Sequence, residues 1–224
     1  MSTVLAFDCA VSGQGVAIVR DGVCLASLFE EGRDQAARLL PAIAAALERA
    51  GVARSQLDMI AVTTGPGSFT GVRVGLSAAR GLAVGLGIPL AGIPTTTVLR
   101  AQATAADRRT VAAVDTRLGD WFCAVGEDPA PFAATAESIA ARLAGQSCLV
   151  VGKDVEPLVR TLLSAGIDAR EQDGPPDPAV LGRLAGETGV EAWAAQNRRE
   201  GLPRPLYLRG VNITLPNGAR RTVE

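Results

Sequence analysis

The residues best suited to chemistry lie in one glycine-rich loop, Gly65-Pro66-Gly67-Ser68-Phe69-Thr70-Gly71, between an apolar run and a helical pattern. A strand, a glycine-rich turn and a helix N-terminus can together present backbone N–H groups to an anion such as a phosphate. The other interpretation is a structural turn in which Ser68 or Thr70 caps the helix that follows. The sequence leaves both interpretations open.

The loop does not match the common nucleotide-binding or nucleophile motifs. Val72 and Arg73 follow the last glycine where a Walker A loop needs Lys and Ser or Thr. Pro66 and Thr70 flank Ser68 where a nucleophile elbow needs glycines. Thr70 also takes the place of the third glycine of a dinucleotide-binding loop. Gly65, Gly67 and Ser68 therefore remain only weak candidates for contact with a cofactor phosphate.

Asp8 is a second candidate, because it ends the apolar run Val4–Asp8. It could approach a Mg²⁺-bound phosphate, with Asp115 of a later hairpin as a base, which would suit an ATPase or phosphotransferase. The simpler interpretation is a carboxylate that caps the turn after a strand. A two-metal nuclease would need a further carboxylate on the fourth strand. That strand ends in Thr63-Thr64, so the nuclease interpretation is nearly excluded.

The composition removes several classes of site. The chain of 224 residues contains no histidine, which excludes Ser-His-Asp triads, Cys-His dyads and histidine-ligated metals. We therefore expect no catalytic residues, no metal site and no cofactor bound by the chain alone. We also expect no meaningful ATPase, protease or nuclease activity from the isolated chain.

Charge and hydropathy point to a globular cytoplasmic protein. The net charge is −1 and 48% of the residues are hydrophobic, which argues against disorder and against general coating of nucleic acid. No apolar run reaches the ~18 residues of a membrane span, and the N-terminus lacks a targeting pattern. Four separated cysteines lie in apolar, strand-like runs, which predicts buried, reduced thiols: Cys9, Cys24, Cys123 and Cys148.

The first half of the chain predicts an α/β lobe. Asp21-Gly22 is a hairpin signal between two strands. Together with alternating strands and helices, this gives the order β-β-β-α-β-α-β-α over residues 1–107, the order of a ribonuclease-H-like fold. Residues 108–196 look like a reduced second copy. Residues 197–224 form an arginine-containing extension, for which we expect a solvated tail over contact with RNA.

Two helices predict an association surface. In the pattern that starts at Val72, an arc of glycines and small residues adjoins a second apolar arc at ~100° per residue. We expect the glycine arc, with Gly71 and Gly75, to face the sheet of the lobe and the second arc to meet a partner. The helix from Gln35 to Ala50 is also apolar on two sides. The predicted interface residues are Leu39, Ile43, Ala46, Leu47, Val72, Leu76, Ala79 and Ala83.

Several strings together resemble one family over essentially the whole chain, less closely after Glu127. They are the N-terminal MSTVLAFDCAVSGQGVAIVRDG, Arg38-Leu39-Leu40-Pro41, TTGPGSFTGVRVGLSAARGLAVGLGIPLAGIPT, VDTRLGDWFCAV and Pro205-Leu206-Tyr207-Leu208-Arg209. The chain is similar to the TsaB (YeaZ) family, paralogous to the TsaD or glycoprotease (peptidase M22-like) family. The resemblance implies two tandem ribonuclease-H-like lobes of the actin, sugar kinase and chaperone ATPase superfamily, the second lobe reduced.

The resemblance also implies a function. Members act in making threonylcarbamoyladenosine next to the anticodon of tRNAs, as a non-catalytic subunit that binds and activates the catalytic paralogue TsaD together with the ATPase TsaE. It implies pairing with TsaD and contact with tRNA only through the complex. From the apolar arcs of the two helices we expect the TsaD heterodimer to form through them, and a weak homodimer to form through the same surface. Cys9, Ala10 and Val11 stand where members usually carry hydroxyl residues, and Gln35-Ala36 replaces a His-Ser pair. These departures place any nucleotide only within the assembled complex.

Overall fold

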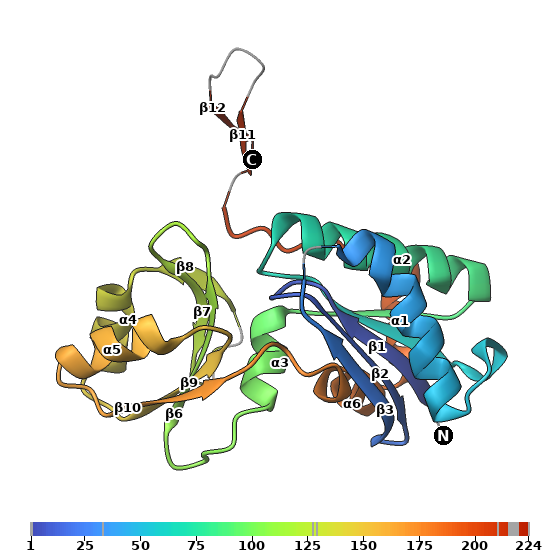
Figure 1. Ribbon diagram of the computed structural model, residues 1–224, viewed down its shortest axis with the longest axis horizontal. Coiled ribbons are helices and arrows are strands. Elements are labelled where there is room, and N and C mark those ends of the chain that lie inside the picture. Colours follow the sequence, from blue (N-terminus) through green and yellow to red (C-terminus); the bar gives the residue numbers. More distant parts are fainter. Residues whose placement is uncertain are drawn as a thin grey trace.

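A computed structural model describes residues 2–32, 34–126, 128, 130–209, 211–214 and 220–223. The chain folds into two α/β lobes, joined by helices and by the segment that follows residue 200 (Figure 1). Among the described residues, no helix combines the length and apolarity that crossing a bilayer requires.

The first lobe is a five-stranded mixed sheet. Its strands are β1 (Thr3–Asp8), β2 (Gln14–Arg20), β3 (Val23–Glu30), β4 (Met59–Thr63) and β5 (Leu90–Ile93), in the order β3-β2-β1-β4-β5. The β1–β2–β3 strands are antiparallel because two-residue and short turns join them, whereas β4 and β5 run parallel to β1 after helical crossovers. This is the predicted ribonuclease-H-like order.

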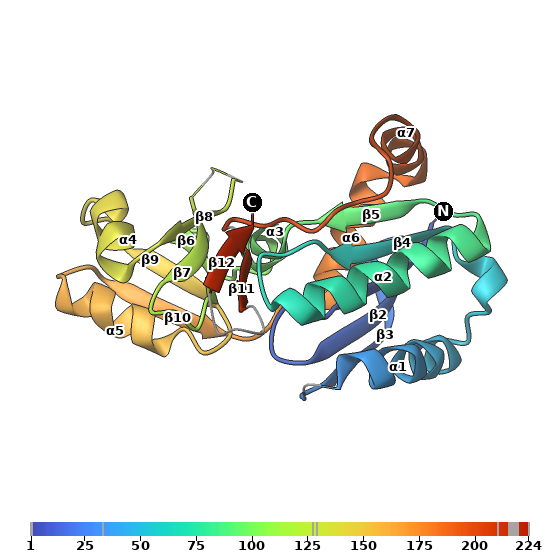
Figure 2. The ribbon, with the colours of Figure 1, turned by 90° about the horizontal axis from the view of Figure 1, so that it is seen from above.

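Two helices cover one face of this sheet (Figure 2): α1 (Gln35–Ala50) packs on β2 and β3, and α2 (Phe69–Leu86) packs on β4. Each ends in a left-handed glycine, Gly51 and Gly87. The α2 helix begins at Phe69, earlier than the predicted Val72, because Ser68 provides the cap.

The second lobe repeats the first. Its strands are β6 (Arg109–Asp115), β7 (Trp121–Val125), β8 (Phe132–Ala134), β9 (Cys148–Gly152) and β10 (Ala169–Asp173), in the order β10-β9-β6-β7-β8. The helices α4 (Ala136–Leu143) and α5 (Glu156–Ser164) cover one face (Figure 1). The sequence did not predict β8, which is only three residues long.

The third helix of each repeat packs on the sheet of the other repeat. The helix α3 (Thr95–Ala101) follows β5 but contacts β6, β7 and β9, and α6 (Pro178–Thr188) follows β10 but contacts β1, β2 and β4. Val180 and Leu181 accordingly share a core cluster with Val4 and Met59. The predicted boundaries of 1–107 and 108–196 therefore do not separate the packed units, because each repeat buries its last helix against the other sheet.

The end of the chain also returns to the first lobe. The helix α7 (Val190–Glu200) was not predicted; its Asn197 side chain pairs with both backbone groups of Leu90 at 2.8 and 3.0 Å. Beyond it, β11 (Val211–Thr214) and β12 (Arg220–Val223) form a hairpin. The predicted tail arginines Arg220 and Arg221 have side chains outside the described part, as does Glu224.

The cysteines lie mostly where the sequence placed them. Cys9, Cys123 and Cys148 are buried free thiols. Cys24 is exposed, contrary to expectation, because it lies on β3 at the sheet edge, where the burial pattern is largely open. Burial raises the pKa of the Cys148 thiol to about 11, so a buried, protonated thiol is its resting form at neutral pH.

Candidate functional site

Asp8 lies at the carboxyl end of β1, beside the end of the parallel strand β4. The Thr63 hydroxyl donates a hydrogen bond of 2.5 Å to Asp8 Oδ1, and the Ala10 N–H donates another of 3.1 Å to the same oxygen. The Val11 N–H lies 3.4 Å from Oδ2. Asp8 is 1% exposed. The carboxylate therefore caps the turn after β1 and has its nearest donors within the chain.

Burial has a measurable electrostatic consequence at this position. Removal from water raises the pKa of Asp8 to about 6, and the hydrogen bonds from Thr63, Ala10 and Val11 only partly oppose that rise. Near neutral pH the group is still mostly ionised. A carboxylate so enclosed is poorly placed to bind a metal ion in the cleft.

The glycine-rich loop rests directly on this turn. The Ser68 N–H donates a hydrogen bond of 2.8 Å to the Ala10 carbonyl. A side chain at Gly67 would overlap Ala10, and one at Gly71 would overlap the Cys9 carbonyl, so both glycines permit close backbone approach. The sequence signal for this contact was the paired glycines, although their partner was not identifiable from the sequence.

Ser68 caps the first turn of α2. Ser68 Oγ accepts a hydrogen bond of 3.2 Å from the Gly71 N–H, and the Ser68 carbonyl accepts one of 2.9 Å from the Val72 N–H. The predicted cap is thus confirmed for Ser68. The cap accounts for the Gly71 N–H, whereas the described residues supply no hydrogen-bond acceptor to the N–H groups of Phe69 and Thr70.

The second hairpin faces the cleft from the other lobe. Asp115 ends β6, accepts a hydrogen bond of 2.7 Å from the Arg117 N–H and lies 3.4 Å from its guanidinium. No hydrogen bond or ion pair within the described ranges joins Asp115 to Asp8. The described residues also contain no group of three or more His, Cys, Asp or Glu side chains that could hold a metal ion.

The C-terminal segment occupies the mouth of the interlobe cleft. The Leu206 N–H donates a hydrogen bond of 2.8 Å to the Thr64 carbonyl, and Arg80 Nε donates one of 3.0 Å to the Pro203 carbonyl. Further on, Arg209 forms an ion pair with Asp120 of the second lobe, including a bond of 3.1 Å from Nη1 to Oδ1. The remaining cleft has a volume of about 360 Å³ and is lined by Pro66, Gly67, Phe69, Val72, Thr116, Leu118, Phe122 and residues 206–209.

Sequence reasoning missed this segment as part of the site. Leu206, Tyr207 and Arg209 stand in a string that supports the family resemblance, but periodicity gives no indication of what they contact. Only long-range packing places them against the glycine-rich loop.

The eight predicted interface residues are buried in the core of the first lobe. Each is at most 7% exposed, and Ala79 is 0% exposed. These residues are Leu39, Ile43, Ala46, Leu47, Val72, Leu76, Ala79 and Ala83. Gly71 and Gly75 face Cys9 and Val62 of the sheet, as predicted, but the second arc is buried beside them and is not free to meet a partner. Val72 and Leu76 of that arc lie in the core because burying their side chains removes apolar area from water.

The outward faces of α1 and α2 carry small and apolar residues beside charged ones. On α1 they include Leu40, which is 56% exposed, and on α2 Val84, which is 72% exposed. Adding a Cβ at Gly81 or Gly85 would meet no atom within 4 Å, so both lie open. The exposed small and apolar positions of this double-helix face include Ala37, Leu40, Pro41, Ala44, Ser77, Gly81, Val84 and Gly85. The same two helices also expose the charged residues Arg38, Glu48, Arg49 and Arg73.

Comparisons with known proteins identify relatives of the chain. A family model described as tRNA N6-adenosine threonylcarbamoyltransferase matches residues 30–144. A protein of Escherichia coli (strain K12) named tRNA threonylcarbamoyladenosine biosynthesis protein TsaB is 36% identical over 126 residues, covering 54% of this chain and 53% of that protein. The chain thus spans about half the length of the curated relatives it matches.

Solved structures extend the likeness to the whole fold. The crystal structure of an uncharacterized Pseudomonas aeruginosa protein with similarity to peptidase YEAZ matches with a TM-score of 0.72 and 30% identity, covering 93% of this chain and 100% of that one. The ROK hexokinase from Thermus thermophilus matches with a TM-score of 0.50 and 12% identity, covering 82% and 97%. The second likeness shows a shared fold alone.

Proposed function

Because the chain belongs to the TsaB (YeaZ) family, we propose that it is a non-catalytic subunit in the synthesis of threonylcarbamoyladenosine on tRNA. In this role it binds and activates a TsaD-type catalytic paralogue, together with the ATPase TsaE. It meets tRNA only through the assembled complex.

The observation that carries the proposal is the outward face of α1 and α2. Two neighbouring helices present small and apolar side chains to water, with Leu40 and Val84 both more than half exposed. Exposed apolar patches of this kind mark association sites. Small residues such as Gly81 and Gly85 permit close packing of a second helix pair. A paralogue with the same fold offers such a pair, and so does a second copy of the chain.

We therefore expect one surface to serve two partners. A weak homodimer forms through the double-helix face by two-fold symmetry, and TsaD replaces the second copy. The interface residues named from the sequence are replaced in this proposal by the exposed residues of the same two helices.

The alternative function is an ATPase or phosphotransferase of the hexokinase-like fold. Two features weigh against it: Asp8 is enclosed by its own turn, and residues 206–209 line the cleft. ATP turnover by the pure chain that disappears in Asp8→Ala would favour this alternative.

Gly81→Glu tests the interface. The substitution fits the isolated chain because an added Cβ meets nothing within 4 Å, and it places a charge in the helix-packing seam. We expect normal thermal unfolding, loss of self-association in sedimentation experiments, and loss of TsaD capture. Gly81→Ala is the steric control and should bind TsaD. Leu163→Glu, at an exposed position of α5, controls for added charge. A folded Gly81→Glu protein that binds TsaD with unchanged affinity would contradict the proposed surface.

A further inference from the structure

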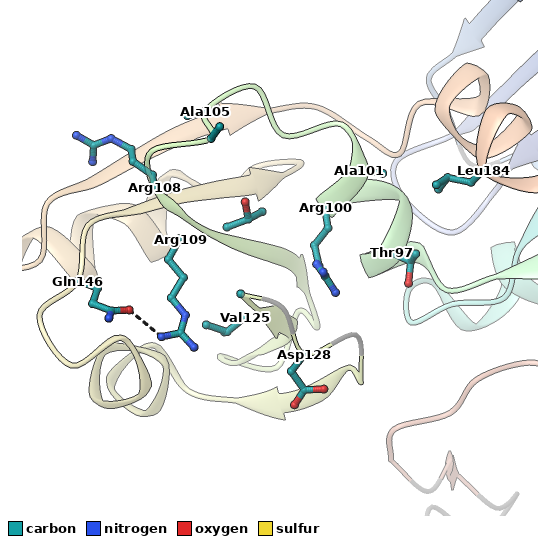
Figure 3. Close-up of a pocket in the computed structure, with 13 residues that line it drawn as sticks. Thr97, Arg100, Ala101, Ala105, Arg108, Arg109, Val125, Asp128, Gln146 and Leu184 are labelled. Atoms are coloured by element: carbon teal, nitrogen blue, oxygen red, sulfur yellow. Dashed lines mark hydrogen bonds between the residues drawn. The ribbon is translucent and has the colours of Figure 1, made fainter. Parts of the chain in front are cut away.

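A second interlobe cavity lies at the opposite end of β6 from Asp115 and the cleft. Its volume is about 820 Å³, compared with about 360 Å³ for the cleft beside the glycine-rich loop. It opens between α3 and the first residues of β6, with the end of β7 as its floor (Figure 3). None of its lining residues belongs to the glycine-rich loop or to the double-helix face.

Two guanidinium groups from different elements point into this cavity. Arg100 comes from the last turn of α3 and Arg109 begins β6, and both extend toward the same end of the cavity, on either side of Val125 (Figure 3). Within the described part of the chain, neither is in an ion pair closer than 4 Å. Asp128 also lines the cavity.

Arg109 is held in position by its neighbours. Its Nη1 donates a hydrogen bond of 2.7 Å to Gln146 Oε1. Its Nε lies so close to Gly126 that an added Cβ there would approach it to 2.7 Å. Because Gly126 has no side chain, the Arg109 guanidinium can lie against the end of β7. The hydrogen bond to Gln146 orients the Arg109 guanidinium through Nη1 and leaves its other N–H groups available for a ligand.

Arg108 also lines the cavity, but its guanidinium is already paired with Asp168. It points away from the other two arginines in Figure 3, and its Nη2 pairs with Asp168 at 2.7 Å. Its side chain is 7% exposed, and its buried Nε has no hydrogen-bond partner among the described residues. The direct contacts are therefore assigned to Arg100 and Arg109.

The chemistry of the cavity selects the class of ligand. Guanidinium groups bind phosphate through paired, charge-assisted hydrogen bonds. A volume of about 820 Å³ lies within the range of small-molecule sites, roughly 300–1,000 Å³. Ala101, Val125 and Leu184 supply apolar surface for an uncharged part of the ligand. A nucleic-acid backbone needs a row of surface cations, whereas this site is a recess.

From these contacts we propose that the cavity binds a small phosphorylated ligand of mononucleotide size, with its phosphate between Arg100 and Arg109. This site is separate from the proposed partner surface and from the cleft.

Isothermal titration of the full chain with AMP and ATP tests the proposal. We expect saturable binding that weakens as salt is added, and a loss of at least about tenfold in Arg109→Gln and in Arg100→Gln, since one charge-assisted hydrogen bond contributes about 1.5–3 kcal/mol. Arg170→Gln, at an exposed position of the second lobe, is the matched control and should bind as the parent does. Thermal unfolding checks that each variant is folded.

Other outcomes overturn the proposal. Inorganic phosphate that binds as tightly as AMP indicates an adventitious ion only. A short single-stranded oligoribonucleotide that binds where AMP and ATP do not indicates an RNA contact. The absence of AMP and ATP binding at millimolar concentration, or binding unaffected by both arginine variants, excludes this cavity as the site.

Discussion

Arg73 and Tyr207 stand 134 positions apart in the sequence, and Arg73 Nε donates a hydrogen bond of 2.8 Å to the Tyr207 hydroxyl. The same guanidinium lies 3.6 Å from the centre of the Phe69 ring. The Phe69 and Tyr207 rings have centroids 5.7 Å apart. One cluster of three side chains therefore joins the start of α2 to the end of the chain, at the edge of the interlobe cleft.

Tyr207→Ala should release the C-terminal segment. The substitution removes the hydrogen bond to Arg73 and the ring contacts, which together contribute on the order of 1–2 kcal/mol. We expect faster amide hydrogen exchange in residues 203–209, with α1 and β3 unaffected. Tyr207→Phe keeps the ring and should show a smaller change. Unaltered exchange in Tyr207→Ala would mean that other contacts hold the segment.

Ala79→Glu should unfold the first lobe. Ala79 is 0% exposed within the core beneath α2, and a buried unpaired charge costs more than about 4 kcal/mol. We expect loss of the cooperative thermal transition of the lobe, measured by circular dichroism. Ser77→Glu is the control, because Ser77 lies on the exposed side of the same helix. A folded Ala79→Glu protein with an unchanged melting temperature would instead support the predicted exposure of the second arc.

Asp8 should make stability depend on pH. Its pKa rises from 3.8 to about 6 on folding, so the folded state favours the protonated carboxyl. This contribution to stability is fully present below pH 4, declines as the pH rises toward 6 and is absent above. The difference corresponds to on the order of 3 kcal/mol.

Denaturant unfolding of Asp8→Asn tests this relation. The free energy of unfolding of the variant, relative to the parent, should increase between pH 4 and pH 7, because only the parent loses stability from this group. Asp34→Asn, at an exposed position before α1, controls for the loss of a carboxylate. A constant difference across that range would show that Asp8 titrates alike in both states.

Ser68→Ala should destabilise the lobe by about 1 kcal/mol, because it removes the acceptor of the 3.2 Å bond from the Gly71 N–H. Thr70→Ala, at an exposed position of the same turn, should change the melting temperature much less. If a protein with both Ser68→Ala and Thr70→Ala kept its melting temperature but the complex lost activity, the glycine-rich loop would instead be a contact site.

Local sequence information was enough for most secondary structure. Asp21-Gly22 marked the hairpin, Gly51 and Gly87 follow the ends of helices, and the alternation of strands and helices predicted the ribonuclease-H-like order, which the structure confirms. These features depend on backbone conformation and periodicity over a few residues. The packing of α3 and α6 on each other's sheets depends on contacts across the whole chain, so no local pattern in the sequence predicted it.

The candidate site was likewise predictable from the sequence only in part. The sequence by itself determined that Ser68 could cap a helix and that histidine-based chemistry is excluded. Only the tertiary structure decided that Ala79 of the second arc is buried as well as Gly71 and Gly75, because periodicity marks the apolar side of a helix but not what that side packs against. Likewise, only the folded chain brings Tyr207 to Arg73 and places Arg100 and Arg109 in the wall of one cavity, since each pair comes from separate elements.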